Sequence, residues 1–592
     1  MGIAAVLKRN KMFGGEIISA ILKAEGVKQV FGIIDGTYFG MYSTFADHGI
    51  GLVTPRHETS ALHMAGAYAR STGTLGVCMA SNGPGVANAL PGVAVENAEG
   101  NRVLLITSSR RQGIIYPDRG GTFQYFPQVE VTAPMTKWSC AVPSVDRIPE
   151  VMRRALRVAW NGRPGVVHVD IPESIMNGKY EPDPSWFRKV NQYRPTEPMA
   201  GSTGQIRRAL RLLAAAKRPL IHVGSGVLHA GAFEELAALA ETLEAPVTTS
   251  WGARAVMDER SRYAVPMIYV DAVTKARREA DVVLAIGSRL GETDWWGKAP
   301  YWGKPEEQKL IQVDLDAECL GVNRPADLAI QADAKELMRQ LVTEQRERGP
   351  VFDISSRRRF VDDIGQACAA RRRKLDKHLS DRNLPMHPAH VATECRKRFD
   401  DDAILVIDGG NTSIWANFYH QVRGANTILG TPKMGMLGAG VAQALGAQVA
   451  HPRRQVYCVI GDGAMGFHQQ EIETAVRNQL PVIFLVLCDK QWGMVKINQQ
   501  FSLKPVKTLV MKSLGPDETI NTDLCETRFD DLARAMGAHG ERVSDPAGLA
   551  GAIDRSLASG RCSVIHVDVD PKKHLWAPNL KTFKDMHAEP EG

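Results

Sequence analysis

The chain has 592 residues, of which 44% are hydrophobic and 23% are charged. This balance is typical of a soluble globular protein and excludes a disordered chain, a collagen-like repeat and a small disulfide scaffold. A chain of this length is longer than a single hydrophobic core can organise, so the length predicts two to four domains. The formal net charge of +7 is a weak bias over such a length and suits anionic small molecules as well as nucleic acid.

The cysteines and the apolar runs of the sequence predict where in the cell the protein is located. The nine cysteines are odd in number and form no Cys-x-x-Cys pair, which predicts reduced thiols in a cytoplasmic protein. No apolar run reaches the roughly 18 residues of a membrane-spanning helix, and residues 1–12 hold too short an apolar stretch for a secretory signal. The basic runs at 357–359 and 371–373 are interpreted as a solvated connector. We therefore expect neither a membrane nor a nucleic-acid partner.

Three α/β blocks follow one another along the chain. Residues 12–182 alternate apolar runs, such as RVLLITS and GVVHVDIP, with helical patterns. Such alternation predicts a parallel sheet with helices on both faces. A polar, proline-containing stretch leads to a second block at 203–345 and then a third at 380–570, and residues 571–592 are predicted to be a tail. The predicted fold class is α/β, with three doubly wound parallel-sheet domains.

The sharpest local pattern is the turn Gly461-Asp462-Gly463, directly after the apolar run QVYCVI. Backbone N–H groups and a carboxylate at the start of a helix suit a phosphate together with a hard metal ion. Asp489 follows the next apolar run, PVIFLVL, so both carboxylates are expected at one edge of the sheet. The pattern predicts a Mg²⁺ site, while the alternative for each aspartate is an ordinary turn or solvated residue.

The two turns, separated by one helix and one strand, resemble the thiamine diphosphate (ThDP) motif. The three blocks resemble the pyrimidine-binding, middle and diphosphate-binding domains of the acetolactate synthase/pyruvate oxidase group. This resemblance implies ThDP and Mg²⁺ as cofactors. It implies Asp462 and Asp489 as metal ligands, with the backbone carbonyl of Gln491 as a third ligand. The motif usually ends in Asn-Asn, whereas this chain has Cys488-Asp489.

Glu58, in the stretch RHETSALHMAGAYARSTG, matches the family's catalytic glutamate. A carboxyl group that is hydrogen-bonded to the N1′ nitrogen of the cofactor favours the tautomer that removes the C2 proton. The alternative for Glu58 alone is a surface residue at a helix start.

The resemblance also assigns the remaining cofactor contacts. Leu437 matches the residue beneath the bent cofactor, and the Gly435 carbonyl matches the acceptor for its amino group. Pro84 lies in a glycine-rich turn that matches the one packing against the cofactor from the partner subunit, which implies a homodimer or homotetramer. The other implied contacts are Asp408, Gly409, Gly410, Asn411, Thr412, Gly461, Gly463, Ala464 and Met465.

One stretch points to a branch of this group. Residues 121–138, GTFQYFPQVEVTAPMTKW, resemble benzaldehyde lyase and 2-hydroxyacyl-CoA lyase, and Gln124 matches the glutamine that points at the reacting carbon there. Residues 31–40 lack the histidines that benzaldehyde lyase has in that region. The expected substrate-pocket residues are Asp35, Thr37, Tyr38, Trp492 and Met494.

We therefore expect a ThDP- and Mg²⁺-dependent lyase or carboligase for a small-molecule substrate. It would cleave or form the C–C bond next to a carbonyl of a 2-hydroxyacyl-CoA or 2-hydroxy ketone, through a ylide and an enamine. The first alternative is a 2-oxo acid decarboxylase or acetolactate-synthase-like transferase, which releases CO₂ in place of an aldehyde. The second is a non-catalytic ThDP- or nucleotide-binding scaffold, against which the presence of Glu58, Asp462 and Gln124 argues.

Overall fold

The computed structural model describes residues 11–118 and 120–585, so most of the N-terminal segment considered for a signal lies outside the described residues. The chain forms two compact units, and within them lie three six-stranded sheets. All pairings inside these sheets are parallel, which confirms the predicted α/β fold. Of the described residues, the first unit comprises 11–118, 120–197, 438–453 and 468–482, and the second comprises 198–437, 454–467 and 483–585.

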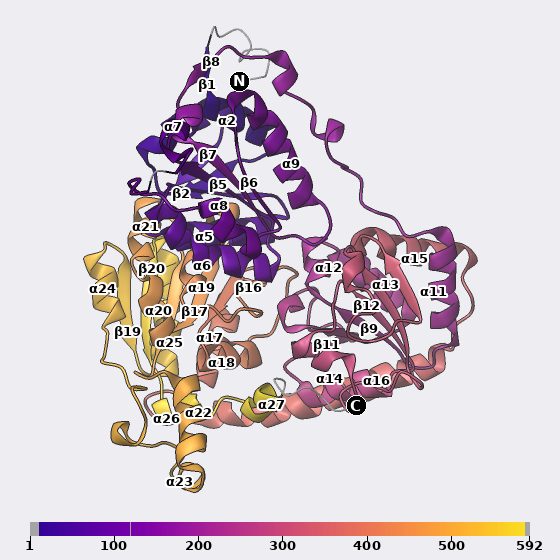
Figure 1. Cartoon of the computed structure of the whole chain (residues 1–592). Helices are drawn as coiled ribbons and strands as arrows, with labels where there is room; N and C mark the ends of the chain where they lie inside the picture. The colour runs from indigo at the N-terminus through magenta and orange to yellow at the C-terminus, as the bar shows by residue number, and fades with distance from the viewer. Residues whose placement is uncertain (1–10, 119, 586–592) are drawn as a thin grey trace. The chain divides into compact units, whose positions relative to one another are not determined.

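The N-terminal sheet has the strand order β3-β2-β4-β5-β7-β6, and Figure 1 labels four of its strands, β2, β5, β6 and β7. Its central strands are continuous apolar runs buried at every position, as a sheet covered on both faces requires. The strands are β2 (Gln29–Gly32), β3 (Gly51–Val53), β4 (Gly76–Ala80), β5 (Val103–Ser109), β6 (Trp138–Ala141) and β7 (Val166–Pro172). The main helices of this unit are α2 (Gly14–Ala24), α5 (Glu58–Thr72), α6 (Pro84–Glu99), α9 (Ile148–Trp160), α19 (Ala439–Ala450) and α21 (Glu471–Arg477).

A close crossing of α5 and α19 fixes the helix that carries Glu58. A Cβ added at Gly446 of α19 would lie 2.3 Å from the backbone oxygen of Met64 in α5. The two backbones can approach this closely only because residue 446 has no side chain. The N-terminus of α5 is therefore set by tight helix packing within this unit.

The middle sheet has the order β11-β10-β9-β12-β13-β14. One face packs against α11, α13 and α15, and the other packs against α14 and α16 (Figure 1). The strands are β9 (Pro219–Val223), β10 (Val247–Thr249), β11 (Ala264–Val265), β12 (Val282–Ile286), β13 (Lys309–Asp314) and β14 (Leu328–Gln331). The helices are α11 (Thr203–Ala215), α13 (Phe233–Leu243), α14 (Val270–Glu279), α15 (Ala334–Arg348) and α16 (Ile354–Asp376).

The C-terminal sheet has the order β16-β15-β17-β18-β20-β19. Its three neighbouring strands β15, β17 and β18 end at one edge, because parallel strands share their carboxyl-terminal edge. The strands are β15 (Ile404–Asp408), β16 (Ile428–Leu429), β17 (Val456–Gly461), β18 (Ile483–Cys488), β19 (His539–Val543) and β20 (Ser563–Asp568). The helices of this part include α17 (Ala389–Arg398), α18 (Asn411–Tyr419), α20 (Asp462–His468), α22 (Gly493–Leu503), α23 (Pro505–Met511), α24 (Phe529–Ala535) and α25 (Pro546–Ser559).

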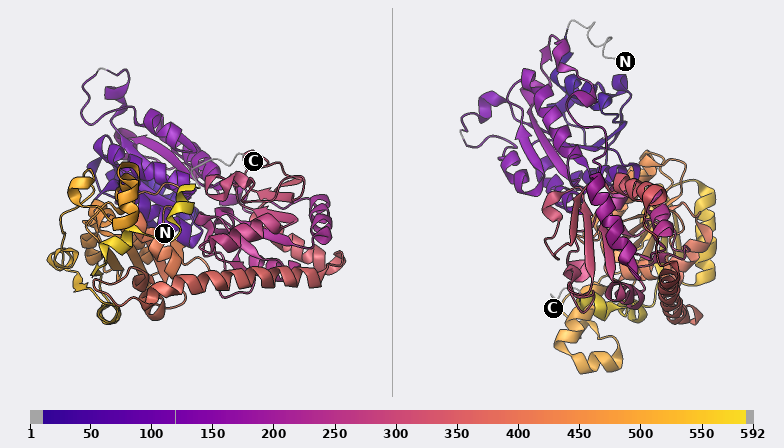
Figure 2. Two further views of the ribbon diagram at one scale, coloured as in Figure 1. Left: turned by 90° about the horizontal axis from the view of Figure 1, so that it is seen from below. Right: turned by 90° about the vertical axis from the view of Figure 1, so that its right-hand side faces the viewer.

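The basic connector is a single long helix, α16, which Figure 2 shows from two sides. Arg357 at its start is fully buried, and its Nη1 donates to the Leu243 carbonyl at 2.8 Å. The interpretation of this run as wholly solvated is therefore wrong at Arg357. Burial lowers the pKa of this guanidinium to about 10, and backbone carbonyls satisfy its donors.

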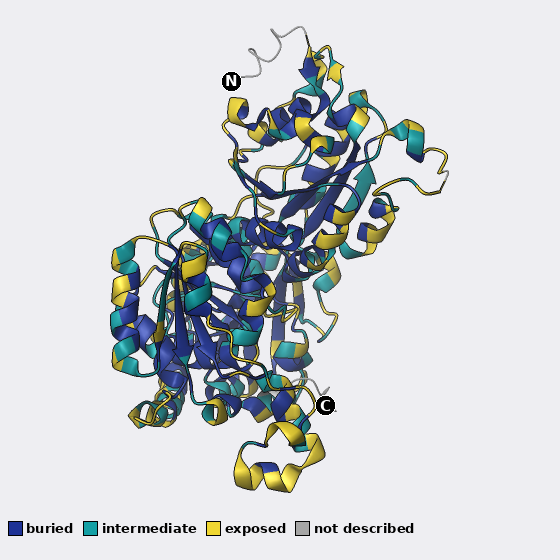
Figure 3. Ribbon diagram, turned by 90° about the vertical axis from the view of Figure 1, so that its left-hand side faces the viewer, coloured by how far each residue is buried: buried dark blue, intermediate teal, exposed yellow. Residues whose placement is uncertain are grey.

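The segment after Asp570, predicted to be a tail, begins with helices α26 (Pro571–Leu575) and α27 (Leu580–Asp585). Asp570 caps α26 by accepting hydrogen bonds from the N–H groups of Lys572 and Lys573, and Pro571 occupies the first helical position. Figure 3 shows the strands as buried and α23, in the segment that projects at the foot of the view, as largely exposed. Across residues 11–118 and 120–585, no helix combines the length and the apolar character needed to cross a membrane.

Candidate cofactor and metal site

Three loops meet at the carboxyl edge of the C-terminal sheet. They follow β15, β17 and β18, and they hold Asp408–Thr412, the turn after Gly461 and the turn after Cys488. Helices α18 and α20 begin within the first two loops, so backbone N–H groups at their starts are directed away from the sheet. This edge is the expected place for a ligand in an open parallel sheet, and helix starts favour phosphate.

Glycines keep the first two loops in close contact. Gly409 has a φ of 101°, and a Cβ at this position would lie 3.3 Å from the Gly461 nitrogen. A Cβ at Gly461 would lie 3.0 Å from the Thr412 hydroxyl. Asn411 and Thr412 are themselves buried at the start of α18. The structure thus brings together the residues expected from the sequence to contact the diphosphate, and the two loops, residues 408–412 and 461–463, form a closely packed cradle.

The two predicted metal-ligating carboxylates lie at this edge and are buried or nearly so. Asp462 accepts from the Lys490 N–H through Oδ2 and from the Gly463 N–H through Oδ1, each at 2.7 Å. Burial, and then the negative charge of Asp489, raise the pKa of Asp462 to about 6. Two buried carboxylates that interact in this way repel each other when both are ionised, and a divalent cation would relieve that repulsion. The donor set therefore fits a hard divalent cation such as Mg²⁺.

The loop after β18 continues into residues beside the cradle. The Gln491 side chain donates to Asp489 Oδ2 at 2.9 Å, and its backbone oxygen accepts from the Gly493 N–H at 2.9 Å. The ring of Trp492 lies over the glycine turn, because a Cβ at Gly463 would be 2.6 Å from it. A Cβ at Gly410 would be 3.0 Å from the Cβ of Met494. Trp492 and Met494, expected in the substrate pocket, thus lie beside the cofactor loops.

Four further predicted contacts differ in exposure. The side chains of Ala464 and Met465 are buried in the protein, so these residues present only their backbone at the start of α20. Gly435 is exposed with a φ of 61°, and Leu437 is half-buried. The roles of Gly435 and Leu437 under the bent cofactor stay predictions.

Glu58 lies in the first compact unit, at the first position of α5. It is 9% exposed, and Asn88 Nδ2 of α6 donates to its Oε2 at 3.2 Å. His57 caps the helix by accepting from the Thr59 N–H at 3.1 Å. A Cβ at Gly85 would lie 3.5 Å from Glu58 Oε1, so α6 approaches this carboxylate closely. The alternative of a freely solvated helix-start glutamate does not match this geometry.

Two more predicted residues of this unit, Pro84 and Gln124, lie at or near the start of α6. Pro84 is the first residue of the helix, after Gly83 with a φ of 64°. Gln124 has a φ of 53°, its backbone oxygen accepts from Asn82 Nδ2 at 2.9 Å, and its side chain is exposed. A left-handed glutamine is unusual and is held here by its neighbours.

Asp35 and Thr37 join the same group, but Tyr38 does not. Asp35 Oδ1 accepts from the Thr37 hydroxyl at 2.6 Å, and that hydroxyl lies 2.6 Å from Ser108 Oγ, which accepts from the Asn82 N–H. Tyr38 is fully buried in the core, and its hydroxyl donates to the Ile33 carbonyl. Burial raises its pKa well above the usual value. Tyr38 is therefore a core residue, and its prediction as a pocket residue is corrected.

Sequence reasoning missed two residues at the site. Asn88 holds Glu58, and His574 contacts Asp489 with its Nδ1 2.6 Å from Oδ2. The signal for the second was available, because Asp570-Pro571 is a typical helix start that argues against a featureless tail. Nothing in the local pattern around Asn88 singles it out.

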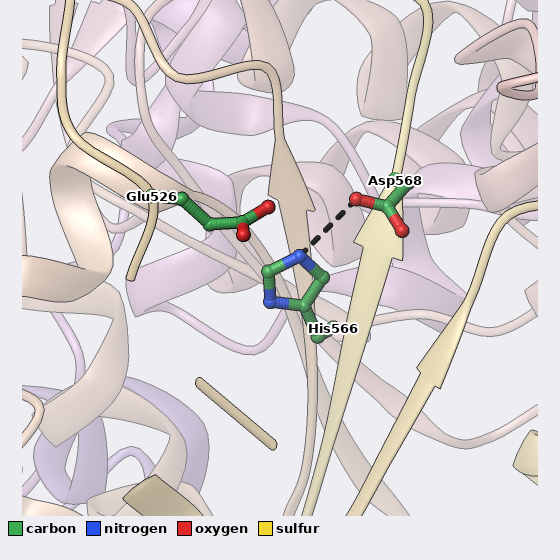
Figure 4. Close-up of side chains that lie close together, drawn as sticks. All are labelled: Glu526, His566 and Asp568. Atoms are coloured by element: carbon green, nitrogen blue, oxygen red, sulfur yellow. Dashed lines mark hydrogen bonds and ion pairs between the residues drawn. The ribbon is translucent and has the colours of Figure 1, made fainter. Parts of the chain in front are cut away.

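A second group of potential metal ligands, drawn in Figure 4, is already neutralised. Ligand atoms of Glu526, His566 and Asp568 lie within 4.8 Å of one another. However, Arg542 donates to both oxygens of Asp568 and to Glu526, each at 2.8 Å, and Lys490 lies 3.0 Å from Glu526. Hydrogen bonds from Lys490 and Arg542 lower the pKa of Glu526 to about 2. Two cations therefore occupy the surroundings that a metal would need.

Three family models match this chain in order. They are the N-terminal thiamine pyrophosphate binding domain at residues 12–131, the central domain of thiamine pyrophosphate enzymes at 206–341, and the C-terminal thiamine pyrophosphate binding domain at 408–567. The chain belongs to the thiamine pyrophosphate enzyme family. In this ThDP enzyme the cradle would hold the diphosphate, and the carboxylates of Asp462 and Asp489 would hold its Mg²⁺.

Relatives of this ThDP enzyme match along nearly its whole length. The acetolactate synthase isozyme 3 large subunit of Escherichia coli is 29% identical over 580 residues, covering 96% of each chain. The probable acetolactate synthase large subunit of Methanocaldococcus jannaschii is 28% identical, covering 95% of this chain and 93% of its own. The acetolactate synthase large subunit IlvB1 of Mycobacterium tuberculosis is 29% identical, covering 94% of this chain and 87% of its own.

Proposed function

We propose that this ThDP enzyme is an acetolactate-synthase-like transferase. It would take a 2-oxo acid such as pyruvate, release CO₂ and join the remaining fragment to a second carbonyl compound. The observation that carries the proposal is the similarity to proteins named acetolactate synthases, which spans 94–96% of this chain in the three relatives above. This favours the alternative expected from the sequence over the lyase branch.

The residues of the chain have separable tasks in such a reaction. Bound ThDP supplies a nucleophilic carbon and an electron sink for the breaking C–C bond. Glu58, with Oε2 held by Asn88, would present a carboxyl group to the cofactor ring and hold a proton there. Asp462 and Asp489 would hold the Mg²⁺, and the loop 408–412 would donate backbone N–H groups to the diphosphate.

A second candidate is cleavage of a 2-hydroxyacyl-CoA or 2-hydroxy ketone, which releases an aldehyde in place of CO₂. One observation favours it. Gln124 has an exposed side chain on a left-handed backbone that Asn82 holds in place, at the position expected for a glutamine that faces the reacting carbon.

We also propose that the protein works as a homodimer or a homotetramer. The resemblance implies that Glu58 and Asp462 serve one cofactor from different chains. The relatives' names support assembly, since each is called a large subunit. Sedimentation of the cofactor-loaded protein at micromolar concentration tests this, and a monomer that turns over substrate would contradict it.

The deciding experiment supplies the ThDP- and Mg²⁺-loaded enzyme with pyruvate, a 2-hydroxyacyl-CoA and an aromatic 2-hydroxy ketone in turn. CO₂ and a five-carbon hydroxy-oxo acid from pyruvate establish the transferase. Aldehyde from either other substrate, without CO₂ from pyruvate, would replace it by the lyase. Glu58→Gln is expected to keep ThDP binding and to lose at least about 100-fold in turnover. Glu150→Gln is the matched control, because Glu150 is an exposed residue of α9 that pairs with Arg147.

A further inference from the structure

The segment that follows the C-terminal sheet is packed onto the predicted metal site. Leu575 of α26 is fully buried, and His574 is 3% exposed. The His574 backbone oxygen accepts from the Trp415 indole at 3.0 Å, and the Pro571 oxygen accepts from Gln491 Nε2 at 2.8 Å. α26 is thus attached to α18 and to the loop after β18. This places the His574 side chain between the two loops.

His574 uses both ring nitrogens inside this site. Its Nδ1 lies 2.6 Å from Asp489 Oδ2, and its Nε2 lies 3.1 Å from the Thr412 hydroxyl. An ionised carboxylate only accepts hydrogen bonds, so Nδ1 is the donor to Asp489. The Thr412 hydroxyl can donate to Nε2, which fixes the orientation of the ring. One buried side chain therefore links a predicted metal ligand to the diphosphate loop.

These contacts make the two carboxylate oxygens of Asp489 different from each other. Oδ2 receives the Nδ1 donor of His574 and the Nε2 donor of Gln491. Among the described residues, no side chain is found to donate to Oδ1. An aspartate has two equivalent oxygens and a negative charge, where the family motif usually has an asparagine with one oxygen. The two donors remove this equivalence and leave one oxygen for a metal.

We propose that His574 is a positioning residue for the metal ion. It orients Asp489 by donating a hydrogen bond to Oδ2, which leaves Oδ1 for the metal. The inference rests on the proposed assignment of Asp462 and Asp489 as metal ligands, but not on the choice of substrate. Partners of this kind around a metal ligand typically change metal affinity 10- to 100-fold when they are removed.

The test measures Mn²⁺ binding to the full chain in the presence of ThDP, by electron paramagnetic resonance of the free ion. Two substitutions separate the contacts of His574. In His574→Asn the side-chain amide lies as many bonds from Cα as Nδ1 does, so the donor to Asp489 is kept. In His574→Gln the amide reaches toward Thr412 instead. We expect His574→Gln to weaken Mn²⁺ binding 10- to 100-fold and His574→Asn to stay within threefold of the parent protein. Lys572→Ala, on the exposed side of α26, is the matched control and should bind like the parent.

Equal losses in the Asn and Gln variants would reduce His574 to a packing residue, and no loss in the Gln variant would also overturn the proposal. A second route uses the Asp489→Asn background, where residue 489 has only one oxygen and no charge. There His574→Gln should have no further effect on Mn²⁺ affinity, and an undiminished effect would contradict the proposal. Asp462→Ala tests the site itself. If it binds Mn²⁺ as well as the parent does, the ligand assignment fails, independently of His574.

Discussion

The contact between Gly463 and Trp492 allows a sharp test of how the metal turn is packed. A Cβ at residue 463 would lie 2.6, 3.0 and 3.2 Å from three carbons of the Trp492 ring. Ordinary carbon contacts are about 3.5–4.0 Å, so the ring or the turn must move by about 1 Å. Overpacking of this kind costs about 1–3 kcal/mol, and we expect Gly463→Ala to lower the free energy of unfolding by about 2 kcal/mol.

The clash partner is a side chain, so a second substitution should relieve it. In a Trp492→Ala background the added methyl meets no ring, and alanine is favoured over glycine in a helix by about 1 kcal/mol. Gly463→Ala should then be neutral or slightly stabilising, which gives a coupling free energy of about 2–3 kcal/mol between the two positions. Urea denaturation of the four cofactor-free proteins, followed by far-ultraviolet circular dichroism, measures it. Equal costs in both backgrounds would refute the packing argument.

Two further predictions concern the first compact unit. Gly446→Ala places a methyl 2.3 Å from the backbone oxygen of Met64, which no side-chain change can relieve, so we expect a loss of at least about 2 kcal/mol in urea denaturation and a lower turnover through displacement of Glu58. Gly113→Ala, with no neighbouring atom within 4 Å, is the control and should change stability by less than about 0.5 kcal/mol. Burial lowers the pKa of His168 to about 3, so the unfolded chain binds this proton more readily. Its contribution to stability is complete above the unfolded pKa of about 6.5 and is lost as the pH falls toward the folded value, by about 2 kcal/mol between pH 7.5 and 5. His168→Gln should remove that part of the pH dependence. If urea denaturation gives the variant the same loss of unfolding free energy between pH 7.5 and 5 as the parent protein, the assignment is contradicted.

The sequence predicted the sheets because buried parallel strands have a strong local signature. The runs ending at Asp408, Gly461 and Cys488 became three neighbouring strands, and the polar residues after them meet at one edge. The prediction failed for residues whose role depends on packing against parts of the chain that are distant in sequence. Tyr38 was expected in the substrate pocket but packs into the core, and Arg357 belongs to a basic run but reaches buried carbonyls. In both cases the neighbouring residues in the sequence do not reveal the packing, because the contacts are made with residues far away in the chain.

The grouping of helices could not be predicted for the same reason. Residues 438–453 and 468–482 lie between strands of the third block in sequence, yet they belong to the first compact unit. The close approach that explains this at α19 depends on Gly446 and Met64, which are far apart in the chain. A pattern that is read segment by segment predicts the helix but not the unit that it joins.

The position of His574 in the chain has a consequence for biosynthesis. His574 is added 85 residues after Asp489, which at typical translation rates is on the order of ten seconds later. By then β20, which ends at Asp568, has already been made, so the C-terminal sheet has all its strands before Asp489 gains its histidine donor. A chain cut just after Asp568 would keep its sheet and both carboxylates, but it would retain metal poorly. Cofactor loading would then report on whether translation had run past this point.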